Sequence, residues 1–113
     1  MTKTYLDYIE DMLKADAEIE DFISGMDFND FLNDKKTINA VIRSFEILGE
    51  AAKSIPISIK GKYADIPWKK IAGMRDKLIH EYAGVDLETI WETIHKDLPQ
   101  LRVNLSKVKQ ELS

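Results

Sequence analysis

The sequence predicts an all-α protein, a compact bundle of four to five helices. Apolar residues recur at alternating spacings of three and four over most of the 113 residues, which is typical of amphipathic helices. No segment shows the strict alternation of apolar and polar residues expected of a half-buried strand. The composition has no internal break, so we expect one domain over residues 1–113.

The first helix is predicted over residues 3–23, before Gly25. Its apolar stripe comprises Tyr5, Ile9, Met12, Ile19 and Ile23. Asp16 interrupts this stripe, and we expect its carboxylate either to be solvated at the edge of the bundle or to face a polar cleft. A short connector follows over residues 28–33, and Phe28 and Phe31 should attach it to the core.

A second helix is predicted from Asp34 to about Ile55, where Pro56 ends it. Its buried stripe comprises Ile38, Val41, Phe45, Leu48 and Ala52. A polar stripe on the same helix comprises Asn39, Arg43, Glu46 and Glu50. This stripe is either an ordinary solvent face with ion pairs, or it lines a functional cleft. Small residues on the helix, Gly49 among them, suggest that another helix approaches closely.

Residues 56–66 are predicted to form a loop around Gly61. Pro67 then suits the first position of a helix that continues through residues 74–82. Gly84 is the expected C-terminal cap of this helix. His80 would therefore lie in its last turn, where the helix dipole favours the protonated imidazolium.

The last segment begins after Asp86, which is a good N-cap. Its apolar residues keep one register: Leu87, Trp91, Ile94, Leu98, Leu101, Leu105, Val108 and Leu112. The register continues through Pro99, so we expect the helix to be kinked or restarted there, with Asp97 as a cap for the restart. His95 lies beside this stripe and is most simply a surface residue.

Composition excludes several classes of site. The chain has no cysteine, which rules out disulfides, thiolate metal sites and cysteine catalysis. It has two histidines and no metal-binding motif, so we expect neither a metal nor a cofactor. No run approaches the roughly 20 apolar residues of a membrane span, and no signal peptide precedes the charged N-terminus. We therefore expect a soluble cytoplasmic protein with no membrane association.

Charge is unevenly distributed along the chain. Residues 1–34 carry ten acidic residues against two lysines, a net charge of −8, whereas residues 60–80 have a net charge of +4. Lys69, Lys70 and Lys77 belong to this basic segment and are the candidates for contacts with a nucleic-acid phosphate backbone. A charge run is often only a solvated face. Here the run surrounds Arg75 and His80.

Arg75, His80 and Tyr82 form the one cluster of functional groups suited to chemistry. At about 100° per residue, Arg75 and Tyr82 share a helix stripe, whereas Arg75 and His80 lie about 140° apart. Asp76 is four residues before His80 and is its neighbour on the helix surface. A site that uses both Arg75 and His80 must wrap around the helix or include a second copy of it.

An arginine and a histidine without a nucleophilic serine or cysteine suit metal-independent cleavage of RNA. His80 could act as a general base or acid near neutral pH, and Arg75 could grip a phosphate through two hydrogen bonds. The substrate's own 2′-hydroxyl would be the nucleophile. Spacing alone favours the plainer alternative, in which Arg75 pairs with a nearby acid and His80 is an ordinary helix-end residue.

The arrangement Arg75-x4-His80-x-Tyr82 resembles the motif of the HEPN superfamily, and within it HepT-like toxins of the HepT/MntA type. The resemblance extends to Ile66-Pro67-Trp68 before the motif and to Gly84-Val85-Asp86-Leu87 after it. It also includes the helix with Ile47-Leu48-Gly49-Glu50-Ala51-Ala52. Asp76 departs from the family pattern, which often has asparagine after the arginine. An acid there could raise the pKa of His80, or repel a phosphate.

The resemblance implies a HEPN-type bundle that forms a homodimer, with a metal-independent endoribonuclease site in the shared cleft. It implies Arg75 and His80 as the catalytic pair. Asp76 and Tyr82 of the same stretch, and Arg43 and Glu50 of the polar stripe, are the supporting candidates. It also implies a partner, an MntA-like nucleotidyltransferase antitoxin that transfers AMP onto Tyr82 and so blocks RNA. The alternative is a non-catalytic HEPN subunit that binds substrate for such a nucleotidyltransferase. A purely structural coiled-coil adaptor leaves the basic segment unexplained.

Overall fold

The structure is a computed structural model that describes residues 4–80 and 86–113, with side chains for 4–77 and 86–113. Seven helices and no strand are present in this part of the chain. The helices are α1 (Tyr5–Phe22), α2 (Phe28–Leu32), α3 (Lys35–Ser54), α4 (Ile57–Lys62), α5 (Trp68–His80), α6 (Leu87–Lys96) and α7 (Leu98–Leu112). The predicted all-α fold is therefore confirmed. None of the described helices is long and apolar enough to cross a membrane.

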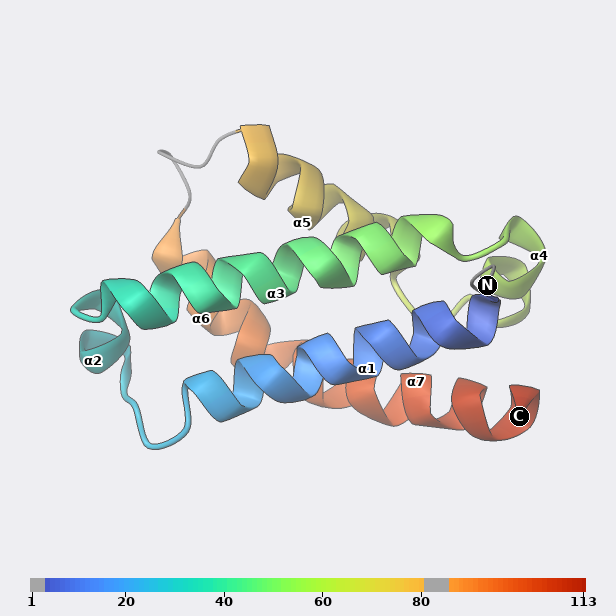
Figure 1. Ribbon diagram of the computed structural model, residues 1–113, viewed down its shortest axis with the longest axis horizontal. Coiled ribbons are helices and arrows are strands. Elements are labelled where there is room, and N and C mark those ends of the chain that lie inside the picture. The colour runs from blue at the N-terminus through green and yellow to red at the C-terminus, as the bar shows by residue number, and fades with distance from the viewer. Residues whose placement is uncertain (1–3, 81–85) are drawn as a thin grey trace.

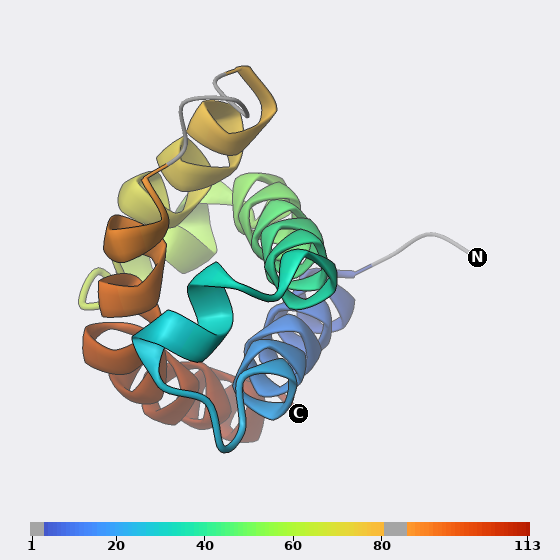
Figure 2. The same cartoon turned by 90° about the vertical axis from the view of Figure 1, so that its left-hand side faces the viewer.

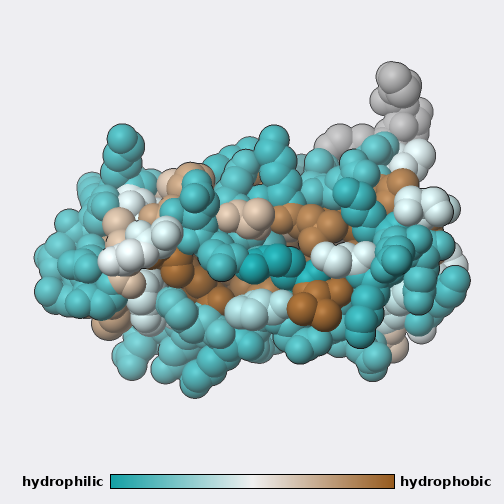
Figure 3. All heavy atoms as spheres, turned by 90° about the horizontal axis from the view of Figure 1, so that it is seen from below, coloured by the Kyte–Doolittle hydropathy of each residue, from teal (hydrophilic) through white to brown (hydrophobic). Residues whose placement is uncertain are grey.

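The long helices lie side by side in a curved row. Figure 1 shows α1 running antiparallel to α3, with α7 against α1 and α5 against α3. Viewed along the bundle, α5, α3, α1 and α7 form an arc that α6 continues, and α2 lies across the near end (Figure 2). From the side of α1 and α7, hydrophilic side chains cover most of the surface, and apolar ones form a broken band across its middle (Figure 3).

The predicted apolar stripes meet in one core. Buried members include Ile9, Met12, Ile19, Val41, Phe45, Leu48, Leu101, Leu105 and Val108. Phe31 is fully buried as well, and its ring centroid lies 5.2 Å from that of Trp91 on α6. The expected anchoring of the connector is therefore confirmed, although the connector itself forms the short helix α2. Asp27 caps this helix through a hydrogen bond from the backbone N–H of Asp30.

The loop predicted over residues 56–66 is the part of the fold that sequence periodicity missed, because it contains α4. Pro56 occupies the N-cap position. Lys60 and Lys62 lie in the last turn, where positive charges interact favourably with the negative end of the helix dipole. No residue of α4 is buried. A helix of six residues that buries no side chain leaves no apolar period in the sequence.

The last predicted segment consists of two helices, α6 and α7, and the second begins beside Pro99, as expected. Asp86 caps α6 by accepting hydrogen bonds from the backbone N–H groups of Glu88 and Thr89. Asp97 occupies the N-cap position of α7, but its side chain makes no capping hydrogen bond. It pairs instead with Lys70 of α5 at 3.0 Å. Asp97 therefore stands at the predicted N-cap position, but its carboxylate pairs with Lys70 of α5 and does not cap the helix.

Asp16 takes neither of its two predicted environments. Its side chain is fully buried, and its Oδ1 accepts hydrogen bonds from Nε and Nη2 of Arg102 on α7 at 3.1 and 2.7 Å. The same Nη2 lies 2.5 Å from Glu20, at the surface. Burial raises the pKa of Asp16, against the opposing effect of Arg102. The acid on the apolar stripe is thus an ion pair that joins α1 to α7.

The contact between α3 and α5 predicts opposite effects for two glycine substitutions. A Cβ at Gly49 would lie 2.2 Å from Cβ of Arg75, whereas a Cβ at Gly73 meets nothing within 4 Å. Gly49→Ala should lower the free energy of unfolding by about 1–3 kcal/mol through overpacking. Gly73→Ala should raise it by about 0.5–1 kcal/mol through helix propensity. Urea denaturation measures both, and equal stability of the two variants would contradict the close approach.

The Asp16 environment predicts a pH-dependent stability difference. Because its native pKa is raised above the ordinary 3.8, the native state takes up this proton at a higher pH than the unfolded chain. The stability of wild type relative to Asp16→Asn should therefore increase as the pH falls through the native pKa, and level off below 3.8. Urea denaturation between pH 7 and about pH 3.5 tests this. Parallel pH profiles for the two proteins would contradict it.

Candidate active site at the contact of α3 and α5

Gly49 determines how closely α5 lies on α3. A Cβ at this position would also approach the backbone oxygen of Ile71 to 3.1 Å, so there is no room for a larger residue. The close approach suggested by the small residues of the second helix is therefore confirmed. It places Arg75 of α5 directly against Gly49, in the C-terminal half of α3.

Arg75 is the catalytic candidate whose side chain the structure describes. The side chain is 28% exposed, and Nη1 lies 3.3 Å from Oδ1 of Asp76. Its Nε is buried and has no hydrogen-bond partner among the described residues. Buried donors are nearly always paired in folded proteins, so an unpaired one deserves a functional explanation. Asp76 takes one donor of the guanidinium, and a guanidinium carries five N–H donors, so an anion could use others.

Asp76 lies between two cations. Its Oδ1 also accepts a hydrogen bond from Nζ of Lys53, in the last turn of α3, at 2.5 Å. The ammonium of Lys53 and, to a lesser extent, the guanidinium of Arg75 hold the pKa of Asp76 below its usual value. The carboxylate is therefore ionised at neutral pH.

His80 is the last described residue of α5, and its backbone is helical. Its side chain lies outside the described residues, as do the whole of Tyr82 and the expected cap Gly84. The roles assigned to His80 and Tyr82 therefore remain predictions. So does the expected effect of Asp76 on the pKa of His80.

The polar stripe of α3 is used differently along its length. Arg43 pairs with Glu46 at 3.2 Å, and its own side chain is 66% exposed. Glu50 lines a hollow with Tyr8 and Asp11 of α1. The supporting roles of Arg43 and Glu50 remain predictions.

Gly49 and Lys53 are the α3 residues that lie against Arg75 and Asp76. Lys53 is a residue that sequence reasoning missed. The only local signal for it is its spacing of four from Gly49.

The three candidate RNA-binding lysines are exposed on α5. Lys70 and Lys77, seven residues apart, both border a hollow that includes Met74 and Asp86. Lys70 is 66% exposed despite its ion pair with Asp97. Lys69 borders a shallow surface beside Trp68, which Lys70 borders as well. A polyanion lying along α5 could therefore contact Lys70 and Lys77 together.

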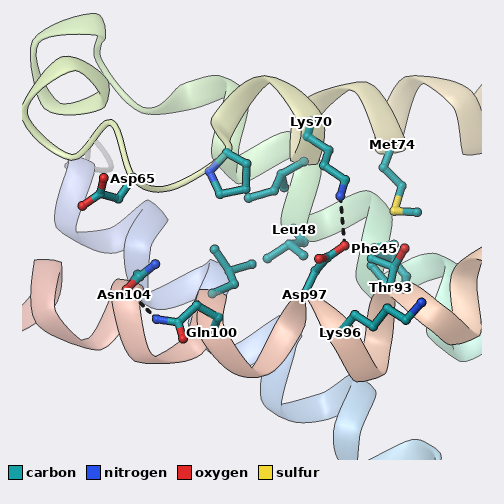
Figure 4. Close-up of a pocket in the computed structure, with 13 residues that line it drawn as sticks. Phe45, Leu48, Asp65, Lys70, Met74, Thr93, Lys96, Asp97, Gln100 and Asn104 are labelled. Carbon is teal, nitrogen blue, oxygen red and sulfur yellow. Dashed lines mark hydrogen bonds and ion pairs between the residues drawn. The ribbon is translucent and has the colours of Figure 1, made fainter.

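A pocket of about 330 Å³ opens between α5, α3 and the junction of α6 and α7. Figure 4 shows Lys70 of α5 reaching across it to Asp97. Met74, also from α5, and Leu48 and Phe45 from α3 line the same pocket. The lining is largely apolar, and its charged residues are two lysines and two aspartates: Lys70, Lys96, Asp65 and Asp97. Its charge therefore does not favour an anion. Within the described residues, no three acidic or histidine side chains gather to hold a metal ion.

Comparison with known proteins identifies relatives over nearly the whole chain. Residues 12–108 match the sequence profile of the family described as "Ribonuclease HepT-like". The chain is 46% identical to the "Probable ribonuclease HepT" of Thermococcus cleftensis, over 97% of this chain and 100% of that protein. It is 43% identical to a "Putative RNase" of Caldanaerobacter subterraneus subsp. tengcongensis, over 96% of this chain and 97% of the relative. No solved structure matches it.

Proposed function

The chain belongs to the HepT-like family of ribonucleases, and we propose that it is a metal-independent endoribonuclease that acts as the toxin of a toxin–antitoxin system. The observation that carries the proposal is the position of the Arg75 side chain and the hydrogen bonding of its guanidinium. Its guanidinium is held against α3, has an unpaired buried Nε, and precedes His80 at the spacing of the family motif. The side chain is 28% exposed, and its guanidinium has N–H donors beyond the one that Asp76 uses, which could bind a phosphate.

In the proposed reaction the RNA supplies the nucleophile. His80 removes the proton from a 2′-hydroxyl, whose oxygen attacks the adjacent phosphorus. Arg75 stabilises the charge that develops on the phosphate oxygens. The bond from phosphorus to the 5′-oxygen then breaks, and that oxygen takes up a proton. The products are a 2′,3′-cyclic phosphate and a 5′-hydroxyl, and no metal takes part.

We propose that the complete site forms between two copies of the chain. Arg75 and His80 lie about 140° apart on an ideal helix, so one α5 alone does not direct both at a single phosphate. Two features support a second copy as the missing part. α5 packs mainly on α3, at one end of the helical arc (Figure 2). Lys69 and Lys77 on the same helix remain exposed. In the dimer, RNA would lie in the cleft between the two motif helices.

The proposed antitoxin is an MntA-like nucleotidyltransferase that transfers AMP from ATP onto Tyr82. The phenol oxygen would form a bond to the α-phosphorus, and pyrophosphate would leave. Tyr82 and Arg75 are seven residues apart, so a helix that continues through Tyr82 would place the new phosphate on the stripe of Arg75. The anion would then occupy the site of the RNA phosphate.

A second candidate is a non-catalytic subunit that binds substrate for the nucleotidyltransferase. The ion pair between Arg75 and Asp76 favours it, because a carboxylate beside the arginine weakens its attraction for phosphate. The net charge of −4 also opposes RNA binding in general. The two candidates differ in whether the protein alone cuts RNA.

Wild-type protein is expected to cleave a labelled RNA mixture in EDTA and to leave 2′,3′-cyclic phosphate ends. Arg75→Ala and His80→Ala should each lower the rate by about 100-fold or more, because each removes a group that acts on the transition state. Gel electrophoresis and mass spectrometry of the fragments measure this. His95→Ala is the matched control and should cut normally, because its ring packs at a tilt against Trp91 on the same helix, α6, and is not part of the motif.

Cleavage by all four proteins would indicate a contaminant or another site. If wild-type protein does not cut and carries no AMP, the non-catalytic candidate takes precedence. Circular dichroism of each variant distinguishes loss of chemistry from loss of the fold.

Coexpression with the nucleotidyltransferase is expected to add the mass of AMP to the protein and to abolish cleavage. Tyr82→Phe should remain unmodified and active, because it lacks the accepting oxygen. Tyr63→Phe is the matched control and should still be modified, because its hydroxyl donates to Glu111 away from the motif. Intact-mass measurement tests this, and an adduct that persists in Tyr82→Phe would refute the assignment.

A further inference from the structure

Three charged groups from two helices meet beside the motif. Oδ1 of Asp76 is 2.5 Å from Nζ of Lys53 and 3.3 Å from Nη1 of Arg75. Lys53 lies 23 residues from Asp76 in the chain and one turn beyond Gly49 on the same face of α3. The close approach at Gly49 therefore brings the ammonium to the carboxylate.

The carboxylate of Asp76 presents an electrostatic problem for phosphate binding. Alone with Arg75, it would cancel the charge of the guanidinium and repel an incoming phosphate. Lys53 changes this balance, because two cations and one anion leave a net charge of +1. The shorter hydrogen bond of Asp76 is the one to Lys53, which leaves the longer bond to Arg75 the easier one to exchange for a phosphate oxygen.

We propose that Lys53 is a positioning residue of the phosphate site: it holds the Asp76 carboxylate and so keeps the guanidinium of Arg75 available for RNA. The inference rests on the proposed ribonuclease function and adds a residue to that site. It also explains how this chain accommodates an acid directly after the motif arginine. The charge of Asp76 is compensated by a lysine from another helix.

Lys53 acts through Asp76, so its effect should depend on the charge at position 76. In the wild-type background, Lys53→Ala should lower kcat/KM for RNA cleavage by about tenfold or more, mainly through KM, because Asp76 then pairs with Arg75 alone. In an Asp76→Asn background, the same substitution should change kcat/KM by less than about twofold, because no charge remains to be compensated.

Lys35→Ala is the matched control, since it removes the same charge from an exposed residue at the other end of α3. It should leave cleavage unchanged. The Lys53 and Asp76 side chains are 43% and 44% exposed, so loss of this pair should affect stability little. Lys53→Ala is therefore expected to fold normally, which thermal unfolding verifies.

Two further readouts do not require catalysis. Carbon NMR of the Asp76 carboxyl should show its pKa rising in Lys53→Ala, because Lys53 is the main cause of its lowered value. Affinity for a 2′-O-methyl RNA, which cannot be cleaved by this route, should fall in Lys53→Ala but not when Asp76→Asn is also present.

The outcomes separate the inference from the proposed function. If wild type cuts RNA and Lys53→Ala cuts equally well, the function stands and the role of Lys53 is wrong. The role is also wrong if Lys53→Ala is equally damaging in both backgrounds, because Lys53 would then contact RNA itself or support the fold. If wild type does not cut, the ribonuclease function is wrong, and binding of 2′-O-methyl RNA decides the role of Lys53. Loss of both cleavage and binding in the wild type would overturn both.

Discussion

The close approach of α5 to α3 at Gly49 is the constraint on which the candidate site depends. A glycine in the middle of a helix is usually unfavourable, but here any side chain would collide with Arg75. α5 contacts mainly α3, so this one contact largely decides where the motif helix lies. Gly49 and Lys53, four residues apart on α3, then supply the contact and the counter-charge. The position of Arg75 is thus determined by packing, and its electrostatic environment by the next turn of the same helix.

This arrangement gives a physical reason for the distribution of charge. Lys53 compensates Asp76 beside the proposed phosphate site, and Lys70 is exposed on the same helix as Arg75. Asp16, which is buried, pairs with Arg102 between α1 and α7, on the opposite side of α3 from α5 (Figure 2). The Asp16–Arg102 pair therefore joins two helices of the bundle, whereas the Lys53–Asp76 pair lies beside the proposed phosphate site. The unpaired buried Nε of Arg75 is consistent with the role proposed for this residue.

Most of the fold was predictable because amphipathic helices have a periodic pattern of apolar residues that can be read from the local sequence. The spacing of apolar residues predicted the long helices, and Pro67, Asp86 and Pro99 predicted where helices begin or restart. α4 has no such pattern, since none of its residues is buried. The environments of Asp16 and Asp97 were mispredicted for a different reason. Their partners, Arg102 and Lys70, lie on distant helices, and no local pattern identifies a partner of that kind.

For the site, the sequence by itself determined the motif residues and their angular relation on one helix, because both follow from local spacing. It also indicated close approach by another helix, through the small residue Gly49. Only the tertiary structure decided which helix approaches, that Gly49 meets Arg75, and that Lys53 reaches Asp76. The physical reason is that the orientation of one helix on another depends on shape complementarity across both surfaces. That complementarity brings together charges that are 23 residues apart in the chain.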